Sequence, residues 1–214
     1  MVLSLISLAA REGERVAVTF EIRNGEDRQR ECFLIPASLV ADLHLSVGEV
    51  DAELYDAVVH GAQVHTALRR GLGILGYGRS SEKILCRKLR MKGIRREIAE
   101  EAVAELLRQG YLNPREDALF EAEKCVQKLW GARRIGAALS EKGYDREAVG
   151  FALYSLEDEG VDYTELCAER IRRSGRGIPT DHDARQKLVA SLLRYGFEAA
   201  EIREAIRTVA EEND

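Results

Sequence analysis

The chain carries an internal repeat that constrains its fold more than any other feature. A unit of Leu, three residues, Gly and a large apolar residue occurs three times, and an alanine follows nine residues after each Gly. The glycines are separated by 50 and 53 residues, a period typical of helical repeat proteins. The units are Leu89–Ile94, Leu139–Tyr144 and Leu192–Phe197, and the alanines are Ala102, Ala152 and Ala205.

Each position of the unit has a physical reason. The Leu and an apolar residue one turn earlier form one face of a helix. Gly is the residue that most easily adopts the left-handed conformation in which helices end, and the next apolar residue then folds back onto the last turn. A small Ala allows the following helix to approach closely. We therefore expect a mostly α fold, a tandem array of three three-helix repeats at 63–110, 111–160 and 161–214.

The N-terminal segment has a different pattern. Apolar residues alternate with others over Arg15–Ile22, which predicts a strand, and Asn24-Gly25 predicts a tight hairpin turn. Glu31–Ile35 is the expected return strand. The first ten residues are expected to form an edge strand. A short helix capped by Ser38 would follow, and helical periodicity starts at about 63. Residues 1–62 are thus predicted to form a small β-rich module.

Composition excludes several classes of function. The four cysteines are far apart with no C-x-x-C pair, and the four histidines have no clustered partners, so we expect no metal, no cofactor and free thiols. No apolar run approaches the roughly 18 residues of a membrane span, and the first ten residues lack the basic flank of a signal peptide. These features predict a cytoplasmic protein without a membrane contact.

Gly71–Gly76 spells G-x-G-x-x-G, the sequence of dinucleotide-binding loops. That fingerprint requires a preceding strand, whereas 64–70 has the pattern of a helix and a basic loop. No other catalytic motif occurs. We therefore expect that the protein is not an enzyme. A nucleotide-dependent enzyme remains a hypothesis that a nucleotide-binding titration would test.

Positive charge is concentrated on an otherwise acidic chain of formal net charge −5. Between Arg69 and Arg96 ten residues are basic and only Glu82 is acidic. Such a surface contacts nucleic-acid phosphate or an acidic protein, or it is simply solvated. The candidate partner-binding residues are Arg79, Arg87, Lys88, Lys92, Arg95, Arg133, Arg134, Lys142, Arg185 and Arg194.

The order and spacing of these motifs resemble the RecX family, bacterial regulators of the RecA recombinase. The matches in the first unit are Ala67-Leu68, Tyr77, Ser81-Glu82, Leu85, Lys88-Leu89 and Lys92-Gly93, followed by the link Gly110–Asn113. Those in the second and third units are Gly131, Arg133–Ile135, Leu139, Lys142-Gly143, Arg185–Leu188, Leu192–Arg194, Gly196-Phe197 and Ile202–Ala205. The chain departs from the family at Gly78 and Ser80, where Arg is usual, and at Glu116-Asp117, which replaces Arg-Phe.

The resemblance implies a monomer that binds the RecA filament on single-stranded DNA. It would inhibit ATP hydrolysis, strand exchange and repressor cleavage by RecA, and so limit recombination and the SOS response. Weak direct contact with DNA is compatible with this function. The alternative hypothesis is a helical repeat protein that binds nucleic acid directly, with an affinity that falls steeply with salt. The low aromatic content argues against extensive base stacking.

Overall fold

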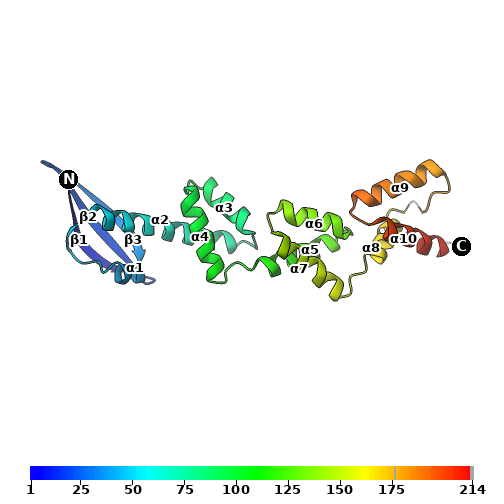
Figure 1. Ribbon diagram of the computed structural model, residues 1–214, viewed down its shortest axis with the longest axis horizontal. Helices are drawn as coiled ribbons and strands as arrows, with labels where there is room; N and C mark the ends of the chain where they lie inside the picture. The colour runs from blue at the N-terminus through cyan, green and yellow to red at the C-terminus, as the bar shows by residue number, and fades with distance from the viewer. Residues whose placement is uncertain (176, 213–214) are drawn as a thin grey trace. The chain divides into compact units, whose positions relative to one another are not determined.

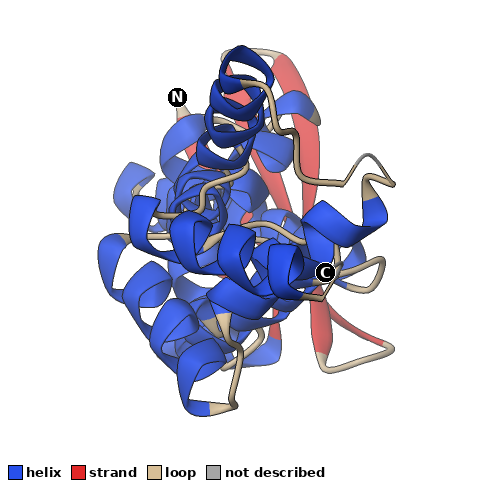
Figure 2. Ribbon diagram, turned by 90° about the vertical axis from the view of Figure 1, so that its right-hand side faces the viewer, coloured by secondary structure: helices blue, strands red, loops and turns tan. Residues whose placement is uncertain are grey.

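The computed structural model describes residues 1–175 and 177–212. The chain begins with one small antiparallel sheet, and the remaining regular structure in these ranges is helical (Figures 1 and 2). It divides into two compact units: Met1–Gly78 with Leu85–Tyr111, and Arg79–Ile84 with Leu112–Asp214. The mostly helical fold with an N-terminal β-rich module is confirmed. The four-part division predicted from the sequence stays a prediction, and residues 176 and 213–214 of its last part lie outside the described residues.

The sheet consists of β1 (Val2–Arg11), β2 (Arg15–Asn24), β3 (Asp27–Pro36) and β4 (Gly48–Val50) in the order β3-β2-β1-β4. The hairpin predicted at Asn24-Gly25 is confirmed, with Asn24 opposite Asp27 and Gly25 at φ +64°. The prediction that the first ten residues form an edge strand is wrong. The short strand β4 pairs with Leu3–Leu5, which makes β1 an interior strand.

One face of the sheet packs against α2 (Ala52–Leu75). Leu5, Phe20 and Ile35 are fully buried there with Val58 of the helix. The Phe20 ring lies edge-on to that of Tyr55, with centroids 5.1 Å apart. The short helix α1 (Ala37–Asp42) starts directly after Pro36 and has no side-chain cap, so the predicted cap by Ser38 is wrong.

The helix α2 begins eleven residues before the predicted start of helical periodicity at about 63. Asp51 caps it, because its carboxylate accepts a hydrogen bond from the Leu54 amide at 2.7 Å. The apolar residues at 54–62 cover the sheet, and the continuous helix then packs against α4 (Arg96–Arg108). The helix α2 therefore continues without a break through the boundary predicted between the β-rich module and the first helical repeat, at 62/63.

The other helices are α3 (Glu82–Met91), α5 (Pro114–Val126), α6 (Ala132–Glu141), α7 (Arg146–Asp158), α8 (Tyr163–Arg173), α9 (His182–Arg194) and α10 (Ala199–Glu211). Three pairs pack closely: α2 with α4, α5 with α7, and α8 with α10. Asp145, Asp162 and Asp181 cap α7, α8 and α9, and their carboxylates accept from amides of the first turn. Ala102, Ala152 and Ala205 are fully buried, as close packing at these positions requires.

The repeated glycines end helices as predicted. Gly93, Gly143 and Gly196 have φ of +82°, +86° and +90°. In each unit the amide after the Gly donates to the carbonyl of the repeated Leu, at 3.2 Å, 3.1 Å and 3.3 Å along the chain. This is the hydrogen bond of a Schellman cap, and it draws the following apolar residue back towards the helix. Tyr144 and Phe197 are accordingly buried.

At two of these glycine turns, the carbonyl of the residue before the Gly accepts a hydrogen bond from the start of an earlier helix. The Ser81 hydroxyl, at the start of α3, donates to the carbonyl of Lys142, the residue before Gly143. The Gly131 amide, at the start of α6, donates at 2.9 Å to the carbonyl of Tyr195, the residue before Gly196. Ser81 and Gly131 both directly precede the first turn of their helix.

Candidate partner-binding surfaces

Two of the predicted basic residues meet around an exposed aromatic ring. Lys88 on α3 and Lys92 just after it line a hollow with Arg70, Gly73, Ile74 and Tyr77. Tyr77 is 98% exposed. The Arg70 guanidinium donates to the Lys92 carbonyl at 2.9 Å, which fixes one wall of this Tyr77 hollow. The hollow therefore offers three positive groups beside a ring that nothing covers.

A second group, the Trp130 cluster, joins the start of α6 to the end of α9. The Arg134 guanidinium lies 4.0 Å from the centroid of the Trp130 ring and 4.8 Å from that of Tyr195. Arg170 of α8 lies 3.0 Å from the Tyr195 centroid, and its burial lowers the pKa of its guanidinium. Arg134 is thus held by stacking on two rings. Its neighbour Arg133 is exposed.

Besides Arg134, three predicted residues are held by contacts within the fold: Arg79, Lys142 and Arg95. Arg79 donates at 2.9 Å to Asp117, a carboxylate whose side chain is 9% exposed, and it also lies over the Phe120 ring. Lys142 is paired with Glu121. Burial of Glu121 raises the pKa of its carboxyl, but hydrogen bonds from Lys124 and Lys142 outweigh this effect and leave the pKa below its usual value.

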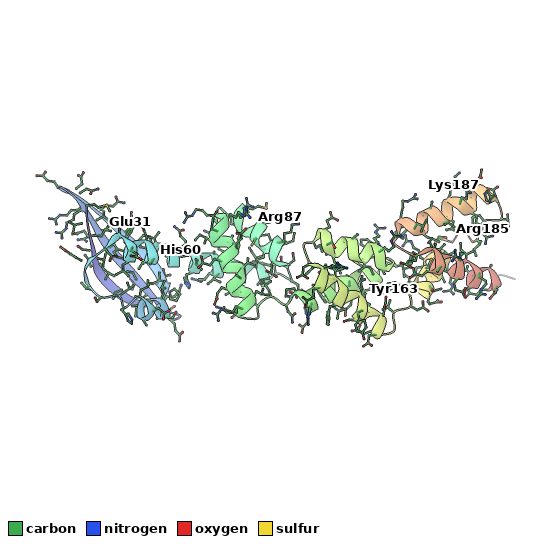
Figure 3. All side chains as sticks on the ribbon, in the orientation of Figure 1. Glu31, His60, Arg87, Tyr163, Arg185 and Lys187 are labelled. Carbon is green, nitrogen blue, oxygen red and sulfur yellow. The ribbon has the colours of Figure 1, made fainter. Side chains whose placement is uncertain are left out.

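Arg95 makes a similar contact, since its guanidinium donates to the Gln63 side chain at 2.5 Å. The other predicted residues are exposed, and within 1–175 and 177–212 no hydrogen bond or ion pair holds their side chains. Figure 3 shows Arg87 on α3, and Arg185 with Lys187 on α9. These exposed residues are Arg87, Lys88, Lys92, Arg133, Arg185 and Arg194.

The G-x-G-x-x-G run lies at the end of α2 and follows no strand. A Cβ on Gly71 would lie 2.7 Å from the Leu106 side chain, so this glycine allows α4 to approach α2. His60 pairs with Glu101 at 2.7 Å. Among the described residues no group of three or more His, Cys, Asp or Glu side chains could hold a metal ion. Within the same residues, none of the helices has the length and apolarity that crossing a membrane requires.

The residue list from the sequence omitted the aromatic members of both surfaces. Tyr77 was named only as part of a family pattern, and Trp130, Arg170 and Tyr195 carried no signal as a group. The one sequence pattern that could have indicated stacking there is the interleaving of basic and aromatic residues at Lys128, Trp130 and Arg133-Arg134. Arg170 and Tyr195 are distant in the sequence, and only the packing of α8 and α9 brings them to Trp130.

No family model matches the chain. A regulatory protein RecX of Xanthomonas axonopodis pv. citri (strain 306) is 36% identical over 143 residues, which cover 66% of this chain and 86% of that protein. Another of Caldanaerobacter subterraneus subsp. tengcongensis is 29% identical over 160 residues, covering 74% and 78%.

Two solved structures share the fold. A crystal structure of a regulatory protein RecX superposes with a TM-score of 0.74 at 21% identity and covers 96% of this chain and 99% of its own. The crystal structure of RecX from Lactobacillus salivarius gives a TM-score of 0.58 at 23% identity, covering 69% and 97%. The shared fold, the repeated glycine turns and the N-terminal sheet agree with the 36% sequence identity, which shows that the chain belongs to the RecX family of regulatory proteins.

Proposed function

We propose that this protein binds the RecA filament on single-stranded DNA and inhibits ATP hydrolysis, strand exchange and repressor cleavage by RecA. It would thereby limit recombination and the SOS response. The observation that carries the proposal is the 36% identity to regulatory proteins named RecX over 86% of their length. We further propose that it acts in the cytoplasm as a monomer, without a cofactor, and has no catalytic activity of its own.

The array that would bind the filament consists, in this proposal, of three copies of one three-helix repeat: α2–α4, α5–α7 and α8–α10. The close packing of the first helix of each set with the third supports it. So do two contacts in which the carbonyl before a glycine turn of the following set accepts a hydrogen bond, at Lys142 from the Ser81 hydroxyl and at Tyr195 from the Gly131 amide.

The exposed basic side chains are the proposed contacts to the filament. No ion pair within the described residues involves Lys88, Lys92 or Arg133. A partner can therefore bind their side chains without breaking a contact that holds the fold together. Arg79, Lys142 and Arg134 already have carboxylate or aromatic partners. We therefore assign the former group to binding and the latter to the architecture of the surface.

The decisive measurement is ATP hydrolysis by RecA on single-stranded DNA with substoichiometric amounts of this protein. The rate is expected to fall, and the protein alone should hydrolyse no ATP. The variant Lys88→Glu/Lys92→Glu/Arg133→Glu should inhibit about tenfold less, since each reversal removes an attractive contact and adds a repulsive one. A control with the same charge change is Arg11→Glu/Arg146→Glu/Arg203→Glu, which alters exposed residues outside both surfaces. No effect of the wild-type protein at any ratio would exclude filament inhibition.

A second candidate function is direct binding of single-stranded nucleic acid. The Tyr77 hollow favours it, because phosphate would meet Arg70, Lys88 and Lys92 while a base stacks on the ring. Anisotropy of labelled oligothymidylate at increasing salt tests this function without RecA. A steep loss of affinity with salt, and a further loss in Tyr77→Ala, would support it.

A further inference from the structure

One edge of the N-terminal sheet is open. β3 pairs with β2 and is the last strand on its side. The Ala37 amide donates to the Glu14 carbonyl at 2.8 Å, so these two residues form a hydrogen-bonded pair of the ladder between β2 and β3. This pair shows which residues of β3 direct their backbone N–H and C=O groups towards β2. Since these groups alternate in an antiparallel pair, those of Phe33 and Ile35 bond to β2 while those of Cys32 and Leu34 point to the open edge. Within the described residues no other group pairs with them.

The open edge forms one side of a hollow of about 460 Å³. Its other side comes from α2 and from the start of α4. The apolar residues that line it from the helices and the turn before α4 are Val59, Ala62, Ile94 and Ile98. The residues that line the hollow are Cys32, Phe33, Leu34, Val59, Ala62, Gln63, Thr66, Arg70, Gly93, Ile94, Arg95 and Ile98.

Proteins usually block an open edge, because unpaired strand groups attract other strands. Here the blocking features lie at the two ends of β3. Arg28 and Arg30 occupy the hairpin end, and Pro36, which has no amide hydrogen, occupies the other. The stretch Cys32–Leu34 between them has neither feature and faces the hollow.

The chemistry of the hollow selects its occupant. Alternating N–H and C=O groups match another peptide backbone, whereas nucleic acid offers no such alternation. The lining includes no carboxylate but has two guanidinium groups, Arg70 and Arg95, whose bonds to the Lys92 carbonyl and the Gln63 side chain use neutral acceptors and leave both charges uncompensated. We infer that this hollow binds an extended acidic segment of a partner protein, which adds a strand to β3 and places a carboxylate against Arg70 and Arg95. This inference does not depend on RecA binding, and its test contains no RecA.

The probe is a fluorescein-labelled decapeptide in which valine and aspartate alternate, titrated with the full chain and followed by anisotropy. Two controls carry N-methyl groups on all valines or on all aspartates, so each lacks the amide donors of one edge. Strand addition uses one edge only, so one control should bind like the parent and the other should bind at least about tenfold more weakly. A valine–lysine decapeptide should also bind about tenfold more weakly.

Matched variants of the protein test the same edge. Leu34→Pro removes an amide hydrogen that the sheet does not use, so it should fold and yet bind the peptide about tenfold more weakly. Leu34→Ala keeps that hydrogen and should bind within about threefold of wild type. If Leu34→Pro fails to fold by circular dichroism, Arg70→Glu/Arg95→Glu replaces it, with the same tenfold loss expected.

Amide hydrogen exchange gives the direct readout. Peptide binding should slow exchange at Cys32 and Leu34 and leave Phe33 unchanged, since Phe33 already bonds to β2. Equal binding of both N-methylated peptides, or no binding at 1 mM, would overturn the inference. Displacement of the peptide by oligothymidylate with protection of the same amides would assign the hollow to nucleic acid instead.

Discussion

The backbones of Gly131 and Gly196 are in direct contact. A Cβ on Gly131 would lie 2.4 Å from the carbonyl carbon and oxygen of Gly196. The hydrogen bonds from Gly131 to Tyr195 and from Arg133 to Gly196, at 2.9 Å and 3.2 Å, hold the two segments together. The start of α6 and the turn after α9 thus meet at a point where no side chain fits, and this contact fixes how the last two helical sets pack.

Replacing Gly131 by alanine should therefore destabilise the protein. We expect Gly131→Ala to lower the free energy of unfolding by about 2–3 kcal/mol, the cost of overpacking a tight contact. The measurement is urea unfolding followed by circular dichroism. Gly150→Ala is the control, because this helical glycine has no atom near its Cβ position and should gain about 0.5–1 kcal/mol. Equal effects of the two substitutions would contradict the contact.

The neighbours Arg133 and Arg134 should separate binding from stability. Arg134→Ala is expected to lower the free energy of unfolding by about 1 kcal/mol, because it removes a cation stacked on two rings. It should also change the fluorescence of Trp130, the only tryptophan of the chain. Arg133→Ala should leave the free energy of unfolding and the Trp130 fluorescence unchanged within error, and should weaken only the inhibition of RecA. The reverse pattern would show that the roles are exchanged.

The pair Arg79–Asp117 should contribute to stability because its carboxylate is buried. Arg79→Ala leaves Asp117 without its cation and should cost about 1–2 kcal/mol of unfolding free energy in a thermal or urea denaturation. The matched control is Arg115→Ala. Its partner Glu147 and Arg115 itself are both exposed, so the loss should stay under about 0.5 kcal/mol. A loss as small for Arg79→Ala as for the control would place the Arg79 side chain in solvent.

Tyr163, labelled in Figure 3, should tolerate loss of its hydroxyl. This group is buried and has no hydrogen-bond partner among the described residues. Tyr163→Phe is therefore expected to keep or raise the unfolding free energy, by up to about 1 kcal/mol, since it removes an unsatisfied polar group. Tyr154→Phe, at a ring that is 68% exposed, is the control without effect.

Alkaline pH provides a second test of the same residue. Burial raises the pKa of Tyr163 from 10.0 to about 12. A raised pKa in the folded state means that the contribution of this group to stability is complete below pH 10 and is lost as pH rises towards 12. Tyr163→Phe should consequently lose less stability than wild type over that range in urea unfolding at stepwise pH. Identical curves for the two proteins would mean that the ring is hydrated.

Local chemistry explains which features could be predicted. A glycine turn needs a glycine at one position and apolar residues at fixed offsets, so the turns at Gly93, Gly143 and Gly196 were visible in the sequence. The hairpin at Asn24-Gly25 was visible for the same reason. The start of α2 was not visible in the sequence. Over such a short stretch, a helix that packs on a sheet and a strand of that sheet have equally apolar residues.

Contacts between distant segments explain the rest. The candidate site could be predicted as a set of basic residues, but not as two separate surfaces. Whether a cation has a partner within the fold depends on what lies opposite, and Asp117, Glu121 and Trp130 are those partners for Arg79, Lys142 and Arg134. The open edge of β3 could not be predicted either, because the order of the strands in the sheet decides which strand lies at an edge.

The sequence by itself therefore determined the glycine turns that end the helices, the N-terminal hairpin, the repeat period and the family, because each can be read from residue types at fixed offsets along the chain. Only the tertiary structure decided which arginines and lysines have a partner within the fold, which glycines touch, and which strand edge is left unpaired. These properties arise where segments that are far apart in sequence exclude water from one another, and no local pattern records that.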